Sequence, residues 1–276
     1  MTAVYLFLGG LLVVAIALGA KTFLNLHRRR KLLVAPPDPA WEKILKKRFP
    51  TFFDLPEDIR HRLTGIMQVF IHEKRFEACG GLREVTEEMR VLIAVQACLL
   101  LVGIEKHGFF PRLRSILIYP DAYRDRRRRT FDIQTENNDV RLGESWNSGS
   151  VVLAWRSVVD GAKGEDDGIN VVFHEFAHQL DQLDHAADGA PPLSNRGDYQ
   201  AWARIFHREY EALVEAAQNP ASDPLFDTYG AENPAEFFAV ATESFFEMPR
   251  EVKEEHPELY EQLSIYYGID PTVWKG

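Results

Sequence analysis

The segment that most constrains this chain is a His-Glu-x-x-His pattern, His174 to His178, inside the apolar stretch 171–181. In a helix of 3.6 residues per turn, His174 and His178 lie one turn apart on the same face, so both imidazoles can bind one metal ion. Glu175 follows the first histidine, where its carboxylate can take a proton from water without binding the metal. The pattern predicts a zinc site on a helix that ends near Leu183.

A catalytic zinc site usually has three protein ligands and one open position, so this pattern needs a third ligand. Asp184 lies six residues beyond His178, but that offset also suits a simple continuation of the helix. Glu236 and Glu243 are seven residues apart, on nearly the same face of a later predicted helix. Asn233 can cap that helix with Glu236 as its capping-box partner, whereas Glu243 lies in a more apolar stretch. The residues alone leave Asp184, Glu236 and Glu243 open.

The amino-terminal residues 2–20 form an apolar run without charge. About 20 such residues cross the roughly 30 Å hydrocarbon core of a bilayer as a helix. No Lys or Arg precedes Lys21, which favours a retained anchor over a cleaved signal peptide. Lys21 and the basic residues at 28–31 then predict that this end of the helix lies in the cytoplasm. We therefore expect a single-pass anchor at residues 2–20 with the rest of the chain facing the cytoplasm.

The remaining chain is interpreted as one linker and one domain. Residues 21–40 are basic and proline-rich, and the Pro-containing segment 35–39 indicates an extended connection. Residues 41–276 then form a single folded domain. Helices are predicted over 59–73, 85–102, 199–218, 234–247 and 258–267, and strands over 115–120 and 150–155. The predicted fold class is α+β, rich in helix with a small sheet.

Charge and cysteine content exclude several functions. The chain carries a net charge of −9, and residues 40–276 alone carry −13, because 1–39 hold five basic residues and one acidic residue. This balance argues against direct binding of nucleic acid, and the run Arg124 to Arg129 is interpreted as a solvated basic loop. Cys79 and Cys98 are too few and too far apart for a disulfide framework or a thiolate zinc site.

Six sequence blocks, in order, carry a resemblance to a known family. They are 90–98, 117–120, 143–146, 149–155, 174–181 and 233–240. On these blocks the chain resembles the Mlc titration factor A family of zinc peptidases, which is similar to the glutamate zincins. The membrane anchor and the Arg124 to Arg129 run are not part of the pattern of the soluble family.

The resemblance implies a function and a set of site residues. It implies a zincin-like metallopeptidase domain that binds one Zn²⁺ per chain through His174, His178 and Glu236. Peptide bonds would be hydrolysed by a zinc-activated water, with Glu175 as general base and Tyr229 donating a hydrogen bond to the oxyanion. The apolar run 2–20, which lies outside the resemblance, adds the bacterial inner membrane as the expected place, and the expected partners are peptide or protein substrates. The alternative is a binding protein that sequesters a transcriptional regulator, with hydrolysis secondary.

Three further residue roles are expected around this site. The strand within 149–155 offers an edge to which an extended peptide can add, with Glu144 and Trp146 near the cleft. For Trp146 and Trp155, packing in the core is an equally good interpretation. Asp181, about one turn after His178, either orients a ligand imidazole or faces solvent.

Overall fold

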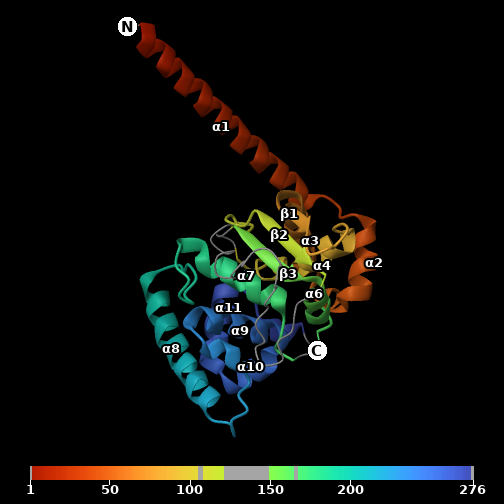
Figure 1. The fold of residues 1–276 in the computed structure, drawn as a ribbon, viewed down its shortest axis with the longest axis vertical. Helices are drawn as coiled ribbons and strands as arrows, with labels where there is room; N and C mark the ends of the chain where they lie inside the picture. The colour runs from red at the N-terminus through yellow and green to blue at the C-terminus, as the bar shows by residue number, and fades with distance from the viewer. Residues whose placement is uncertain (1, 105–107, 121–148, 165–166, 275–276) are drawn as a thin grey trace.

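A computed structural model describes residues 2–104, 108–120, 149–164 and 167–274 of the chain (Figure 1). The predicted basic loop at 124–129 and the block 143–146, with Glu144 and Trp146, lie outside these residues. The elements in order are α1 (Thr2–Val34), α2 (Pro39–Arg48), η1 (Pro50–Phe53), α3 (Glu57–Glu73), β1 (Arg75–Ala78), α4 (Glu87–Leu99), β2 (Ser115–Tyr119), β3 (Ser150–Ala154), α6 (Trp155–Gly161), α7 (Val171–Asp181), η2 (Gln182–Asp184), α8 (Arg196–Gln218), η3 (Thr228–Ala231), α9 (Pro234–Glu247), α10 (Pro249–Glu255), α11 (Pro257–Tyr267) and η4 (Pro271–Val273).

The sheet has three parallel strands in the order β1-β2-β3. Ser115 of β2 is level with Arg75 of β1 and with Ser150 of β3, so the three strands begin at the same edge. The predicted strands β2 and β3 are confirmed, and so is the α+β class. β1 was not predicted, because its four residues alternate too briefly to distinguish them from a turn.

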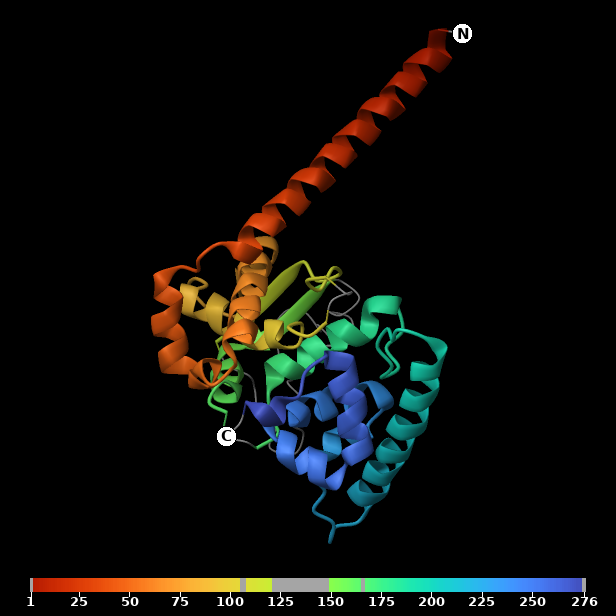
Figure 2. The same cartoon turned by 180° about the vertical axis from the view of Figure 1, so that it is seen from behind.

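Helix α7, which carries the His-Glu-x-x-His pattern, lies between the sheet and the carboxy-terminal helices (Figures 1 and 2). It packs against β3 and α4 on one side and against α9 on the other. All of its residues are buried, in agreement with the apolar stretch that predicted it. The helix that carries the motif is therefore the centre of the domain.

Aromatic rings fill the core on the sheet side of α7. Phe176 of α7 lies with its ring centroid 4.8 Å from that of Phe110 and 5.7 Å from that of Phe70, and all three side chains are fully buried. Such edge-on and tilted pairs are favourable beyond the area they bury. They hold one face of α7 in place, so the opposite face, with the histidines, has a fixed position.

The predicted helices are confirmed with small differences at their ends. Thr86 caps α4 by accepting a hydrogen bond from the backbone N–H of Met89 at 3.3 Å, and α4 is buried from Val91 to Leu99 as predicted. Trp155 does not extend β3 but begins α6, where it is half-buried against the core. Three helices, α2, α6 and α10, were not predicted. α6 and α10 have only seven residues each, which carry too little periodicity.

The amino-terminal helix continues past the apolar run. α1 extends from Thr2 to Val34, whereas the sequence prediction ended the helix at residue 20 and assigned 21–40 to a linker. Residues 21–34 contain no Gly or Pro and several good helix formers, so nothing stops the helix before Pro36. Residues 10–34 are long and apolar enough to cross a membrane, by length and composition alone.

Candidate metal centre

Helix α7 begins at a buried asparagine, Asn170. The side chain of Asn170 accepts hydrogen bonds from the backbone N–H groups of Val172 and Phe173 at 3.0 and 3.1 Å. Its Nδ2 donates to Gln96 Oε1 and to Glu247 Oε1, both at 3.0 Å. An Asn directly before an apolar helix is a recognisable cap, but its bonds to distant side chains follow only from the fold.

Three potential ligand atoms converge above α7. His178 Nε2 lies 3.2 Å from His174 Nε2, and Glu236 Oε2 lies 3.0 Å from His174 Nε2 and 3.4 Å from His178 Nε2. Zinc bound at about 2.0–2.1 Å with tetrahedral angles separates neighbouring ligand atoms by about 3.3 Å. All three residues are buried, and their donor set of two imidazoles and one carboxylate fits a metal ion.

Glu236 reaches this cluster although it stands in the first turn of α9. Its backbone N–H donates to Asn233 Oδ1 at 3.1 Å, so Asn233 caps the helix as predicted. The Glu236 carboxylate lies beside the two imidazoles. Burial would raise the pKa of this carboxyl, but the two histidines outweigh it and lower the pKa to about 2. Glu236 is therefore an anion that faces the histidines.

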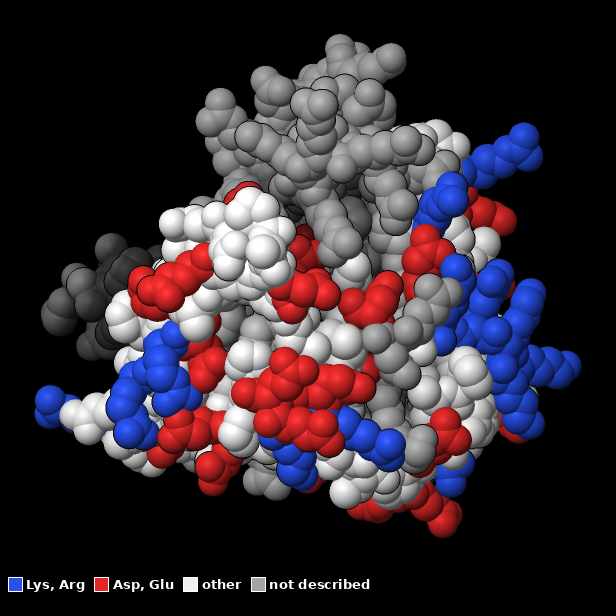
Figure 3. Space-filling view, turned by 90° about the horizontal axis from the view of Figure 1, so that it is seen from below, with Lys and Arg blue, Asp and Glu red and all other residues white. Residues whose placement is uncertain are grey.

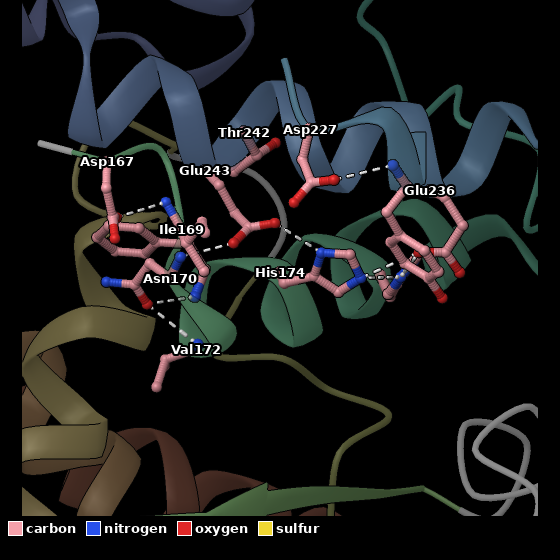
Figure 4. A network of polar contacts seen from close by, with 12 residues as sticks. Asp167, Ile169, Asn170, Val172, His174, Asp227, Glu236, Thr242 and Glu243 are labelled. Carbon is pink, nitrogen blue, oxygen red and sulfur yellow. Dashed lines mark hydrogen bonds and ion pairs between the residues drawn. The ribbon is translucent and has the colours of Figure 1, made fainter. Parts of the chain in front are cut away.

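Glu243 lies on the other side of the His174 ring (Figure 4). Its Oε1 is 2.7 Å from His174 Nδ1, and its Oε2 accepts the backbone N–H of Asn170 at 2.6 Å. A carboxylate at Nδ1 fixes the tautomer of a metal-binding histidine and leaves Nε2 to the metal. Glu243 therefore contacts His174 from the Nδ1 side, whereas Glu236 lies beside the Nε2 atoms of both histidines.

Two other acidic residues near the end of α7 are not part of the cluster. Asp184, the alternative third ligand, is exposed in η2 and accepts the backbone N–H of Ala186. Asp181 is fully buried and does not face solvent; its Oδ2 accepts the backbone N–H of Gly189 at 3.1 Å. Burial raises the pKa of Asp181 to about 7. Asp181 therefore holds the loop before α8.

Tyr229 and Glu175 adjoin the cluster. The Tyr229 ring centroid, in η3, is 5.8 Å from that of His174. Burial, followed by the nearby carboxylates of Glu236, Glu232 and Glu175, raises the pKa of Tyr229, so its hydroxyl keeps its proton at neutral pH. Glu175 is 4% exposed, and its charge acts on both His174 and Tyr229. The structure thus brings all five residues named from the sequence to one place.

The two histidines differ in their electrostatics. Burial would lower the pKa of His174, but the carboxylates of Glu243 and Glu236 raise it well above 6.5. For His178, burial dominates and lowers the pKa. In the absence of a metal, His174 is therefore the ring that holds a proton, and it must lose that proton before Nε2 can bind a metal ion.

Comparison with known proteins identifies the family. Residues 23–268 match the family described as glucose-regulated metallo-peptidase M90. The chain belongs to this metallopeptidase family. The match begins at residue 23, after the apolar run 2–20.

Relatives of this M90 chain cover most of its length. An uncharacterised protein of Synechocystis sp. is 41% identical over 89% of this chain and 90% of its own length. Mlc titration factor A of Klebsiella pneumoniae is 31% identical over 84% of this chain and 87% of its own, and that of Edwardsiella ictaluri is 33% identical over 80% and 85%. The resemblance drawn from the six sequence blocks is confirmed at the level of the family.

The different positions of Glu236 and Glu243 lead to different expected losses. Glu236→Ala removes one of the three clustered atoms that could hold a metal ion, so we expect this variant to lose stoichiometric zinc. Glu243→Ala removes only the support of His174, so it should retain zinc with an affinity about 10–100-fold lower. Zinc per chain, measured by elemental analysis and by chelator competition, checks both. Retention by Glu236→Ala together with loss by Glu243→Ala would reverse the assignment.

The raised pKa of His174 predicts proton release on metal binding. At pH 7 zinc should displace the proton held by this ring, and the apparent affinity should rise with pH up to the pKa of His174. Titration calorimetry in buffers of different ionisation enthalpy measures the number of protons released. Glu243→Gln removes a carboxylate that stabilises this proton on His174, so zinc binding to this variant should release fewer protons. Equal release from both proteins would contradict the assignment.

Proposed function

We propose that this chain is a zinc-dependent peptidase anchored in the bacterial inner membrane, with residues 41–276 as a zincin-like domain in the cytoplasm. The observation that carries the proposal is the near-equal separation, 3.0 to 3.4 Å, of the ligand atoms of His174, His178 and Glu236. Membership of a metallopeptidase family supports the same chemistry. One Zn²⁺ per chain, held by these residues, would polarise a peptide carbonyl and lower the pKa of a water molecule.

Glu175 is the proposed general base. It follows His174 on α7, is 4% exposed, and its charge acts on both His174 and Tyr229. From there it takes a proton from the attacking water and delivers it to the leaving amine nitrogen. Its burial keeps bulk water from competing for that proton.

Tyr229 is the proposed donor to the oxyanion. As the peptide carbonyl oxygen becomes negative, the hydroxyl of Tyr229 donates a hydrogen bond to it. The raised pKa of Tyr229 supports this role, because a protonated hydroxyl is required at neutral pH. The position of Tyr229 before α9, the helix that carries Glu236, links the donor and the ligand on one segment.

The edge strand β3 is the proposed binding place of the substrate backbone. Within the described part of the chain β3 pairs only with β2, and we infer that a substrate strand adds along its other side. β3 also packs against α7, which carries Glu175 and both histidines. A peptide along β3 would therefore pass the metal centre in an extended form.

Binding of a transcriptional regulator is the second candidate function. It is supported by the relatives named Mlc titration factor A, whose name describes an effect on Mlc. In that case the metal centre would stabilise the domain and hydrolysis would be secondary. The two functions predict different effects of the substitution Glu175→Gln.

Glu175→Gln distinguishes the two functions. We expect it to bind zinc normally and to lose peptide hydrolysis by about 10²–10⁴-fold, because it cannot accept the proton of water. Tyr229→Phe should lose about 10²–10³-fold through the missing oxyanion donor. Both are measured as kcat/KM on a quenched fluorescent peptide library, with Asp184→Asn as a matched control. Full activity of Glu175→Gln would exclude this mechanism, and a zinc-loaded but inactive parent protein would favour regulator binding.

The proposed orientation follows from the basic residues after the apolar run, Lys21 and positions 28–31. We expect a tag after Gly276 to resist protease in intact spheroplasts and to be cleaved after the cells are opened. Exchange of Lys21, Arg28 and Arg30 for Glu should weaken this preference. Cleavage of the tag in intact spheroplasts of the parent protein would place the domain outside.

A further inference from the structure

The end of α1 is fixed rigidly to the domain. Arg29 makes a bidentate ion pair with Glu73 of α3, with N–O distances of 2.6 and 2.8 Å. Gln68 donates to the backbone oxygen of Ala35 at 2.8 Å. The backbone of α1 also packs on Gly65, where an added Cβ would lie 2.4 Å from Leu33 O. These contacts fix the direction of α1 relative to α3.

The same contacts define which edge of the domain faces the apolar part of α1. Arg29 meets Glu73 near the end of α3, whereas Leu33 meets Gly65 two turns earlier, so the two helices run in opposite directions. Residues 2–27 therefore extend beyond the carboxy-terminal end of α3. That end leads directly into β1, so the edge where the strands begin faces the apolar helix (Figure 1).

Basic residues gather at this edge. We call the following residues the anchor-side surface: Arg28, Arg30, Lys31, Arg75 and Arg114. All five are exposed. The backbone N–H of Arg75 donates to the oxygen of Arg114 at 3.0 Å, so these two residues are neighbours across the sheet edge. Two acidic residues beside this surface have partners: Glu73 binds Arg29, and Glu77 lies 3.9 Å from Arg75 and accepts a hydrogen bond from Ser115.

The opposite end of the domain is acidic. Figure 3, which shows the face turned away from α1, has acidic side chains gathered in its centre with basic ones at its margins. α10 lies at this end and exposes Glu251, Glu254 and Glu255 (Figure 1). Because the cytoplasmic leaflet carries negative charge, this distribution favours one orientation of the domain.

The length of the helix brings the anchor-side surface to the head groups. If the hydrocarbon ends near Lys21, Arg28 lies seven residues further, or about 10 Å at 1.5 Å per residue. The polar head-group layer on each side is about 5–8 Å thick. A flexible linker at 21–40 would allow any distance between the domain and the hydrocarbon. A continuous helix allows only this distance of about 10 Å.

We propose that the anchor-side surface lies against anionic lipid head groups and holds the metal centre at a fixed height above the bilayer. The proposal rests on membrane insertion of α1, which belongs to the proposed function. The surface continues to the metal centre through the loop 108–114. Phe109 lies under the guanidinium of Arg29 at 5.2 Å, and Arg112 donates to the backbone oxygen of Gln182, just after α7.

A head-group quencher tests this contact on the full chain. The protein is reconstituted in nanodiscs with and without phosphatidylglycerol, and a fluorophore is attached at Pro111→Cys or, as control, at Glu254→Cys, both in a Cys79→Ser background. We expect nitroxide on the lipid head groups to quench the probe at 111 several-fold more than the probe at 254. The excess should grow with phosphatidylglycerol and shrink in about 1 M salt, where charges are screened within about 3 Å.

A charge-reversed variant and an extraction assay separate the causes. Arg75→Glu combined with Arg114→Glu should abolish the dependence on phosphatidylglycerol at position 111. Equal quenching at 111 and 254, in protein that resists carbonate extraction, would overturn the lipid contact and leave the anchor intact. Release of the parent protein by carbonate would overturn the insertion of α1 on which the proposal rests. Peptide hydrolysis by the same samples reports on the peptidase proposal independently.

Discussion

The structure depends on the burial of several carboxylates around one helix. Glu175, Glu236, Glu243 and Glu247 are all at most 6% exposed, although charged groups without partners are costly to bury. Glu236 faces the two imidazoles, Glu243 contacts His174, and Glu247 accepts from Asn170. Such groups remain stable in the core only because each has a partner. This requirement fixes α7 and α9 relative to each other.

Asn170 joins this polar network to the fold. Its side-chain oxygen accepts a backbone N–H from the first turn of α7. Its side-chain nitrogen donates to Gln96 of α4 and to Glu247 of α9, and its backbone N–H donates to Glu243. A single residue therefore connects three helices at the first turn of the helix that carries both histidines. Aromatic packing at Phe176, one turn along α7, holds the helix from the sheet side. Together they hold His174, His178 and Glu236 in fixed relative positions, which reduces the cost of assembling a metal site there.

The amino-terminal helix adds a constraint of a different kind. In a protein on a flexible tether, the distance between the site and the membrane would vary with the linker. Here α1 continues into the domain and contacts it at Arg29 and Gly65, so the apolar helix and the domain form one body. The basic residues lie near the apolar helix and an acidic face lies opposite, which is the charge distribution that a negatively charged membrane favours.

Local sequence determined most of the elements, and the tertiary structure decided which carboxylate joins the two histidines in one cluster. The apolar stretch 171–181 predicted α7 and placed His174 and His178 on one face, because both depend only on helical periodicity. The choice between Glu236 and Glu243 could not be made from spacing, since seven residues bring both to nearly the same face of α9. The packing of α9 across α7 decided it, with Glu236 at the Nε2 atoms and Glu243 at Nδ1. The tertiary structure also decided β1, because its four residues become a strand only through their pairing with β2.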